Sequence, residues 1–202
     1  MDLLSAGTDT TSNTITFAIM FLAIHQDVQA KIHKEMDDAI GRDRLPTIRD
    51  RPDLVYTDAT LMEVLRFRGP LPIMIPHRVT KNSNVYGYDL PLDCHLLINV
   101  HSVLMDKQYW KDPETFRPER FVTPEGKIRK EERLIPFGKG KRSCLGETLA
   151  RIMSFVFFAS LVQAYKFTLA PGVTIEDTRG VYGFTLAPPE FKVVATPRIK
   201  IQ

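Results

Sequence analysis

The stretch FGKGKRSCLG, residues Phe137–Gly146, decides how the rest of this chain is read. It is a glycine-rich turn that places Cys144 immediately before an apolar helix. At such a position the free backbone N–H groups of the first helical turn and the helix dipole favour a thiolate, and a thiolate can ligate iron. The glycines let the backbone approach a flat cofactor, Phe137 can cover the sulfur, and Arg142 can meet a carboxylate of that cofactor. The alternative is a structural cysteine that follows a flexible loop.

Composition places the chain among globular proteins. Its 202 residues are 44% hydrophobic and 25% charged, which suits one large or two small domains and excludes disordered, collagen-like and disulfide-stapled chains. The net charge of +3 gives no reason to predict nucleic-acid binding. The two cysteines, Cys94 and Cys144, lie in dissimilar surroundings, so a reducing compartment is expected. The longest apolar stretches, 15–24 and 152–162, fall short of the roughly 20 residues that a membrane helix needs.

Hydrophobic periodicity predicts a mainly α-helical chain with small β-sheets. The first forty residues are expected to be helical, with a second helix from about Asp27 that ends at Gly41 and carries a Lys31–Glu35 surface pair. Further helices are expected over 54–67 and 147–164, the last buried on all sides because it is apolar all round. Short strands are expected over 78–100 and 167–201, and a long ordered loop over 106–140.

The glycine-rich turn resembles the haem-binding signature of the cytochrome P450 superfamily, the haem-thiolate monooxygenases. The matching positions are Phe137, Gly138, Gly140, Arg142, Cys144 and Gly146. Two further elements follow the family order: Glu63-Val-Leu-Arg66 resembles its Glu-x-x-Arg helix, and 113–121 resembles the segment that supplies a second arginine. The resemblance implies a buried triad of Glu63, Arg66 and Arg120 that fixes the long loop beneath the haem, with Cys144 as the iron ligand. Taken alone, Glu63 and Arg66 would be an ordinary solvated ion pair.

The resemblance also assigns roles around the opening helix. Ala6–Thr11 resembles the family's oxygen-side helix, which implies that Asp9 and Thr10 deliver protons; alone, the string would be an N-terminal cap. His77 is implied to face a haem propionate, with an exposed loop histidine as an equal alternative. The implied substrate pocket is lipophilic, although its residues taken singly could be plain core; they are Ala6, Thr11, Leu71, Ile75, Phe184 and Thr185. The other histidines lack the spacing of a metal site and are expected to be surface or structural; they are His25, His33, His95 and His101.

From this resemblance we expect residues 1–202 to form the C-terminal, haem-binding part of a single cytochrome P450 domain, with the N-terminal anchor and the substrate roof outside it. The expected reaction is insertion of one oxygen atom from O2 into a lipophilic small molecule by a microsomal-type enzyme that carries haem b. Electrons are expected from NADPH-cytochrome P450 reductase docking near Lys139, Lys141 and Arg151, with cytochrome b5 as a second donor. The expected location is the cytoplasmic face of the endoplasmic reticulum membrane.

Two alternatives stay open at this point. A haem-thiolate isomerase or dehydratase would share Cys144 but would need no acid–threonine pair, so Asp9 and Thr10 count against it. A truncated chain without catalytic activity would retain the same motifs.

Overall fold

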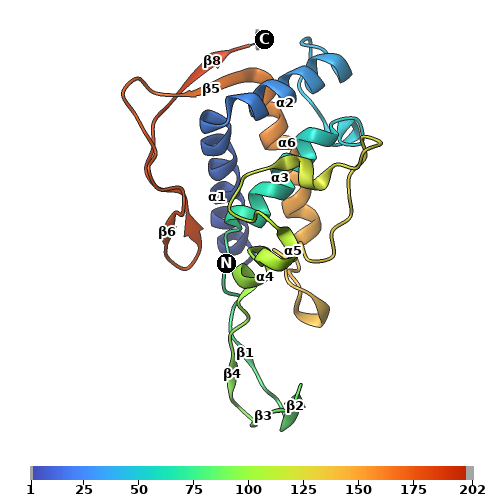
Figure 1. Cartoon of the computed structure of the whole chain (residues 1–202), viewed down its shortest axis with the longest axis vertical. Coiled ribbons are helices and arrows are strands. Elements are labelled where there is room, and N and C mark those ends of the chain that lie inside the picture. Colours follow the sequence, from blue (N-terminus) through green and yellow to red (C-terminus); the bar gives the residue numbers. More distant parts are fainter. Residues whose placement is uncertain (1, 199–202) are drawn as a thin grey trace.

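The computed structural model describes residues 2–198 as a helical body with short strands at its edges (Figure 1). This confirms the prediction of a mainly α-helical chain with small sheets. The long helices are α1 (Asp2–Ile24), α2 (Gln26–Ala39), α3 (Val55–Arg68) and α6 (Glu147–Ala164). The shorter ones are α4 (Val100–Leu104), α5 (Lys107–Trp110) and the 3-10 turns η1 (Ile48–Asp50), η2 (Pro118–Phe121) and η3 (Gly140–Arg142). Of these, α5, η2 and η3 lie within or at the end of the predicted loop 106–140, and α4 ends just before it. The loop is therefore ordered.

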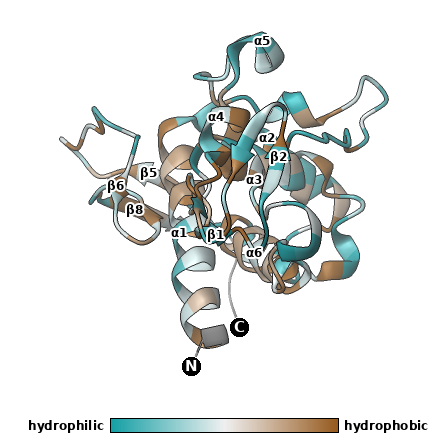
Figure 2. Ribbon diagram, turned by 90° about the horizontal axis from the view of Figure 1, so that it is seen from below, coloured by the Kyte–Doolittle hydropathy of each residue, from teal (hydrophilic) through white to brown (hydrophobic). Residues whose placement is uncertain are grey.

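The core forms where α1, α2, α3 and α6 pack together. Phe21 of α1 is 1% exposed and stacks on Phe116 with ring centroids 4.7 Å apart. Phe155 and Phe158 of α6 join this cluster, which removes large apolar surfaces from water. The burial is uneven along α1: residues 17–18 and 20–23 are buried, whereas Leu4 is 77% exposed. Figure 2 shows the N-terminal turns of α1 extending beyond the rest of the body.

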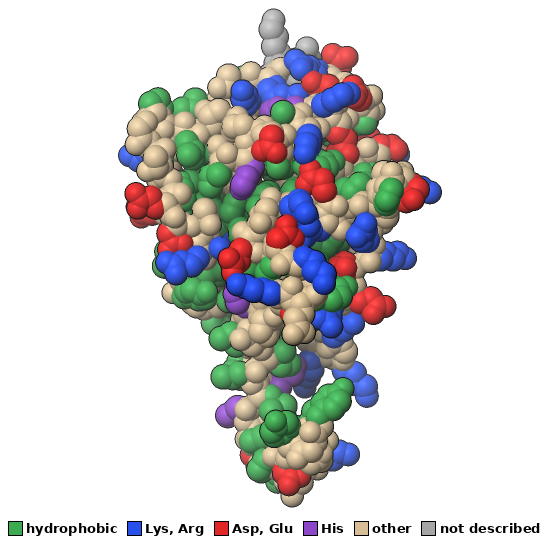
Figure 3. Space-filling view, viewed as in Figure 1, with side chains coloured by type: hydrophobic (Ala, Val, Ile, Leu, Met, Phe, Trp, Pro, Cys, Tyr) green, Lys and Arg blue, Asp and Glu red, His purple; other side chains and the backbone are tan. Residues whose placement is uncertain are grey.

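Four two-stranded antiparallel sheets account for the described strands. β1 (His77–Arg78) pairs with β4 (His95–Leu96), and β2 (Ser83–Val85) pairs with β3 (Tyr88–Leu90) at the far end of the same extended arm (Figure 1). β5 (Tyr165–Leu169) pairs with β8 (Val193–Pro197), and β6 (Val181–Tyr182) pairs with β7 (Leu186–Ala187). Hydrophobic side chains gather at the tip of the arm (Figure 3), where Tyr86 is 99% exposed.

The prediction that the helix over 147–164 is buried on all sides is wrong. Leu149 is 62% exposed and Phe157 is 50% exposed, because no described element covers that side of α6. By length and composition α6 could also cross a membrane, which corrects the expectation that no apolar stretch is long enough. Its opposite side packs against α1 as a core helix does, so the length is weak evidence for a membrane span.

The predicted Lys31–Glu35 surface pair is also wrong. Lys31 instead bonds Glu119 at 2.6 Å. Glu35 reaches from α2 to the start of α3, where its carboxylate accepts the backbone N–H groups of Tyr56 at 2.5 Å and Thr57 at 2.9 Å. Because Leu54 provides no side-chain cap for α3, a carboxylate from another helix satisfies the free N–H groups of its first turn.

Candidate functional site

The loop before α6 presents Cys144 to solvent. Its backbone N–H donates to the carbonyl oxygen of Phe137 at 2.9 Å, which closes the loop on itself. The side chain of Cys144 is exposed, and Gly146 follows as the N-cap of α6. A Cβ atom placed on Gly146 would lie 3.9 Å from the Cys144 sulfur. The loop therefore offers an accessible thiol at the start of a long helix.

Two glycines give the loop its shape. Gly138 and Gly140 have φ of +77° and +80°, in the left-handed region that favours glycine. At Gly138 a Cβ atom would also clash with the terminal methyl of Met74, whereas at Gly140 it would meet open space. Met74 is held in turn by its N–H, which donates to the carbonyl of Ile98 at 3.0 Å. The cysteine loop thus packs directly on the segment 71–75.

The other predicted cofactor contacts are Phe137 and Arg142, which belong to this loop, and His77, which lies on β1. The ring of Phe137 lies beneath the Arg151 guanidinium at 4.7 Å, and Arg151 pairs with Glu147 at 2.8 Å. Arg142 is exposed in η3, and His77 is half-buried in β1, where it pairs with Leu96 of β4. Among residues 2–198 neither Arg142 nor His77 has a salt-bridge partner, so both are available to a carboxylate.

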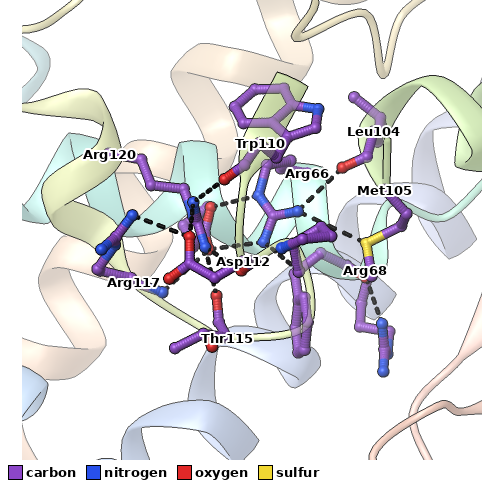
Figure 4. A network of polar contacts seen from close by, with 12 residues as sticks. Arg66, Arg68, Leu104, Met105, Trp110, Asp112, Thr115, Arg117 and Arg120 are labelled. Carbon is purple, nitrogen blue, oxygen red and sulfur yellow. Dashed lines mark hydrogen bonds and ion pairs between the residues drawn. The ribbon is translucent and has the colours of Figure 1, made fainter. Parts of the chain in front are cut away.

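Glu63, Arg66 and Arg120 come together in a buried ion cluster, in which Figure 4 labels the two arginines. Arg66 donates to both Glu63 oxygens, at 2.7 and 2.8 Å, and Arg120 Nε lies 3.3 Å from Glu63 Oε1. The side chains of Glu63 and Arg66 are fully buried, and that of Arg120 is 5% exposed. Arg66 also donates to the carbonyls of Leu104 and Pro113, both at 2.9 Å. One arginine of α3 thereby fixes α4 and the segment before η2.

The structure adds a fourth charge to this cluster that the sequence analysis missed. Asp112 accepts from Arg120 Nη1 at 2.8 Å and from Arg117 Nη2 at 3.0 Å (Figure 4). Burial opposes ionisation of Asp112, but the hydrogen bond from Arg120 and the charges of both arginines lower its pKa. Asp112 is thus shared between Arg120 and Arg117 at the edge of the cluster, where its side chain is 40% exposed. The available signal was a carboxylate followed within nine residues by two arginines.

On α1, the predicted proton-delivery residues lie in the exposed N-terminal half. The Thr10 hydroxyl donates to the carbonyl oxygen of Ala6 at 2.7 Å, and Asp9 is exposed. Ala6 and Thr10 share one side of the helix, whereas Thr11 lies about 140° round the axis from Ala6. The predicted pocket residues Ala6 and Thr11 therefore do not face the same way.

A contact that the sequence did not suggest joins α1 to the turn between β6 and β7. Asn13 Nδ2 donates to Thr185 Oγ1 at 3.1 Å. Leu186, the next residue, donates its N–H to the carbonyl of Pro70 at 2.8 Å. This brings the turn that carries Phe184 next to both α1 and the segment 71–75, so three of the predicted pocket segments adjoin one another. Phe184 is 84% exposed and Ile75 is 59% exposed, and Leu71 is half-buried.

The remaining histidines form no metal site among residues 2–198, where no group of three or more His, Cys, Asp or Glu is placed to hold an ion. His25 stacks on Phe116 at 5.2 Å, and Nε2 of His33 is buried without a hydrogen-bond partner. Burial, followed by the charge of Arg198, lowers the pKa of His33 to about 4. His95 and His101 are exposed.

Comparison with known proteins finds relatives that match nearly the whole chain. Cytochrome P450 2U1 of Mus musculus is 40% identical over 98% of this chain and 37% of its own length. Farnesoate epoxidase of Bombyx mori is 40% identical over 98% of the chain and 40% of its own length, and cytochrome P450 1A1 of Cavia porcellus is 40% identical over 92% and 36%. The chain therefore spans about two fifths of the length of these curated relatives. The model of the family described as cytochrome P450 matches residues 1–195, so the chain belongs to the cytochrome P450 family.

Proposed function

We propose that this chain forms the haem-binding part of a microsomal-type monooxygenase, which inserts one oxygen atom from O2 into a lipophilic small molecule by hydroxylation or epoxidation. The observation that carries the proposal is the accessible Cys144 thiol, held in a glycine loop at the start of α6 in a chain of the cytochrome P450 family. That family implies a haem iron with an axial thiolate.

The residues present fit such a group. The Cys144 thiol is exposed beside Gly146, which has no side chain to cover it. The loop backbone at Gly138 sits so close to Met74 that no Cβ atom fits between them, so this face of the loop is held by packing. When bound, the haem supplies the redox chemistry that activates O2. Within the protein, Cys144 would ligate the iron.

Two side chains are proposed to bind the acidic edge of the haem. Arg142 offers a planar set of donors that matches a carboxylate, and His77 offers a second donor from β1. Both lack a salt-bridge partner among the described residues, so binding a propionate would not first require breaking an internal pair.

Asp9 and Thr10 of α1 are proposed to deliver protons during the activation of O2. Because the Thr10 hydroxyl donates its hydrogen to Ala6, its oxygen is left to accept a hydrogen bond from a water molecule, and it could donate a proton only after the bond to Ala6 is released. Asp9 is exposed and can exchange protons with solvent. The pair thus connects solvent to the hydroxyl of Thr10.

Apolar groups next to α1 favour a lipophilic substrate. Ile75 and Phe184 present large apolar surfaces to solvent, and the half-buried Leu71 belongs to the same segment as Ile75. The name of one relative, farnesoate epoxidase, supports including epoxidation among the proposed reactions. Thr11 is a weaker candidate for the pocket because it lies round the helix from Ala6.

The electron donor is proposed to be a flavoprotein reductase, with cytochrome b5 as a second donor, at the endoplasmic reticulum. Lys139 and Lys141 are exposed on the cysteine loop and can attract an acidic partner. Arg151 is paired with Glu147 and stacked on Phe137, so it contributes less free charge to this surface than the two lysines.

The decisive test compares the two cysteines. After haem is added to the chain, we expect the reduced, carbon monoxide-bound form to show a thiolate-type spectrum that Cys144→Ser abolishes and Cys94→Ser preserves. Cys94 is the matched control because it is the other cysteine and lies outside the loop. A thiolate spectrum that survives in Cys144→Ser would refute the ligand assignment. Product formation that requires neither NADPH nor O2 would favour an isomerase or dehydratase instead.

A further inference from the structure

We infer that Asn13 is a positioning residue, which holds the turn between β6 and β7 against α1 and so fixes the position of Phe184. The consequence for substrate recognition rests on the proposed function, whereas the placement of the turn does not. The inference is based on the hydrogen bond from Asn13 Nδ2 to Thr185 Oγ1, which joins side chains 172 residues apart in the sequence.

Asn13 lies between the exposed N-terminal half of α1, which carries Asp9 and Thr10, and the buried half that follows. It follows Thr10 by three residues and precedes Phe17 by four, so all three share one side of the helix. Phe17 is fully buried and contacts the base of the β6–β7 hairpin, because a Cβ atom at Gly180 would lie 2.9 Å from its ring. Asn13 is one turn nearer the exposed end of α1, and its amide meets the tip of the same hairpin.

Several contacts hold the base of the hairpin. Arg68 Nε donates to the carbonyl of Thr178 at 2.8 Å, and its guanidinium stacks on Phe67 at 4.1 Å. On the other strand, the N–H of Leu186 donates to the carbonyl of Pro70 at 2.8 Å. The base is therefore tied to the C-terminal end of α3 by contacts that do not involve α1.

The tip has much less support. β6 and β7 pair at two positions only, and a hairpin of that length is marginal by itself. The bond from the N–H of Gly183 to the carbonyl of Thr185, at 3.2 Å, lies within the turn and does not fix it to the body. Phe184 is 84% exposed, so packing does not hold it either. Among residues 2–198, the contact that links the tip to α1 is thus the side-chain hydrogen bond between Asn13 and Thr185.

This tie would set the width of the gap between Phe184 and the side of α1 that bears Ala6 and Thr10. A lipophilic substrate that reaches Thr10 would pass between them. Asn13 would then influence specificity through Thr185 and Phe184, without contacting the substrate.

Hydrogen exchange in the chain without haem tests the placement directly. In Asn13→Ala we expect the Gly183 amide to exchange about threefold to tenfold faster, the range expected for the net loss of one hydrogen bond. The Leu186 amide, which bonds Pro70, should change by less than about twofold if the base stays in place. Alanine favours helix at position 13, so α1 itself should not loosen.

Matched variants separate the tie from a general effect on the fold. Thr185→Val removes the acceptor at nearly the same volume and should speed Gly183 exchange as much as Asn13→Ala does. Thr185→Ser keeps the hydroxyl, so Gly183 exchange should stay slow. The double variant Asn13→Ala with Thr185→Val should be no faster than either single one. Ser12→Ala, which loses hydroxyl bonds made only within α1, should exchange at the original rate.

Unchanged Gly183 exchange in Asn13→Ala, or equal effects of Thr185→Val and Thr185→Ser, would overturn the inference. Because these measurements need neither haem nor turnover, they stay valid even if the Cys144 spectrum disproves the proposed function.

Discussion

Replacing Glu63 by glutamine should destabilise the chain far more than any exposed carboxylate-to-amide change. Glu63 is fully buried and accepts from Arg66, from Arg120 and, at 2.9 Å, from the backbone N–H of Arg117. Glutamine keeps the shape but removes the charge, which leaves two buried guanidinium groups with only Asp112 as a counter-ion. Breaking a buried pair costs about 3–5 kcal/mol because of the stranded charge. Total stabilities are typically about 5–15 kcal/mol, so the loss should be obvious.

Urea unfolding followed by tryptophan fluorescence measures this effect at the site itself. The single tryptophan, Trp110, is 6% exposed and its ring lies 5.3 Å from the Arg66 guanidinium. At a slope of about 2 kcal/mol per molar urea, the midpoint should fall by about 2 M. The control is Glu114→Gln, because Glu114 pairs with Lys107 while both side chains are more than 70% exposed; no measurable shift is expected there. If both variants shifted the midpoint equally, the buried cluster would not stabilise the fold as argued.

Two further predictions follow from the cysteine loop and from α2. Gly138→Ala should weaken haem retention and lower the unfolding midpoint more than Gly140→Ala, because both residues have positive φ but only the first would clash with Met74; equal effects in a side-by-side titration would show that backbone strain alone matters. Stability should also fall as the pH drops from 6.5 to about 4 and then level off, since the buried His33 near Arg198 resists a proton that the unfolded chain accepts. Unfolding midpoints measured across that range should lose this step in His33→Gln, and an unaltered pH profile would contradict the assignment.

The elements with strong local signals were predictable from the sequence. The helix over 54–67 ends where Gly69 and Pro70 stop it, and the structure places α3 over Val55–Arg68. The helix over 147–164 was predicted within these bounds, but not which of its sides is covered, because an all-apolar pattern contains no information on its neighbours. Leu149 and Phe157 therefore lie exposed where burial was expected.

The contacts that position the site were much harder to predict. The helical spacing predicts a pair between Glu35 and Lys31, whereas in the structure Glu35 caps α3 by accepting from Tyr56, 21 residues away in the sequence. Asn13 and Thr185 meet across almost the whole chain and have no local pattern that connects them. Such contacts depend on how the helices pack, whereas the glycine loop and the Glu63–Arg66 spacing are encoded over a few residues. A resemblance between motifs can supply the members of a cluster, but not additions to it such as Asp112.

The charges of the site are divided between two regions with different physical roles. In the interior, the Glu63 carboxylate pairs with the buried Arg66 and Arg120, as it must because an unpaired buried charge is costly. Asp112, whose side chain is 40% exposed, pairs with Arg120 from the edge of the cluster. On the cysteine loop, the cations Lys139, Lys141 and Arg142 have no salt-bridge partner among residues 2–198, and all three are exposed. The ion-paired cluster fixes the segment before η2 against α3. The loop keeps its positive potential for an anion or an acidic protein surface, and this potential should weaken as salt is added.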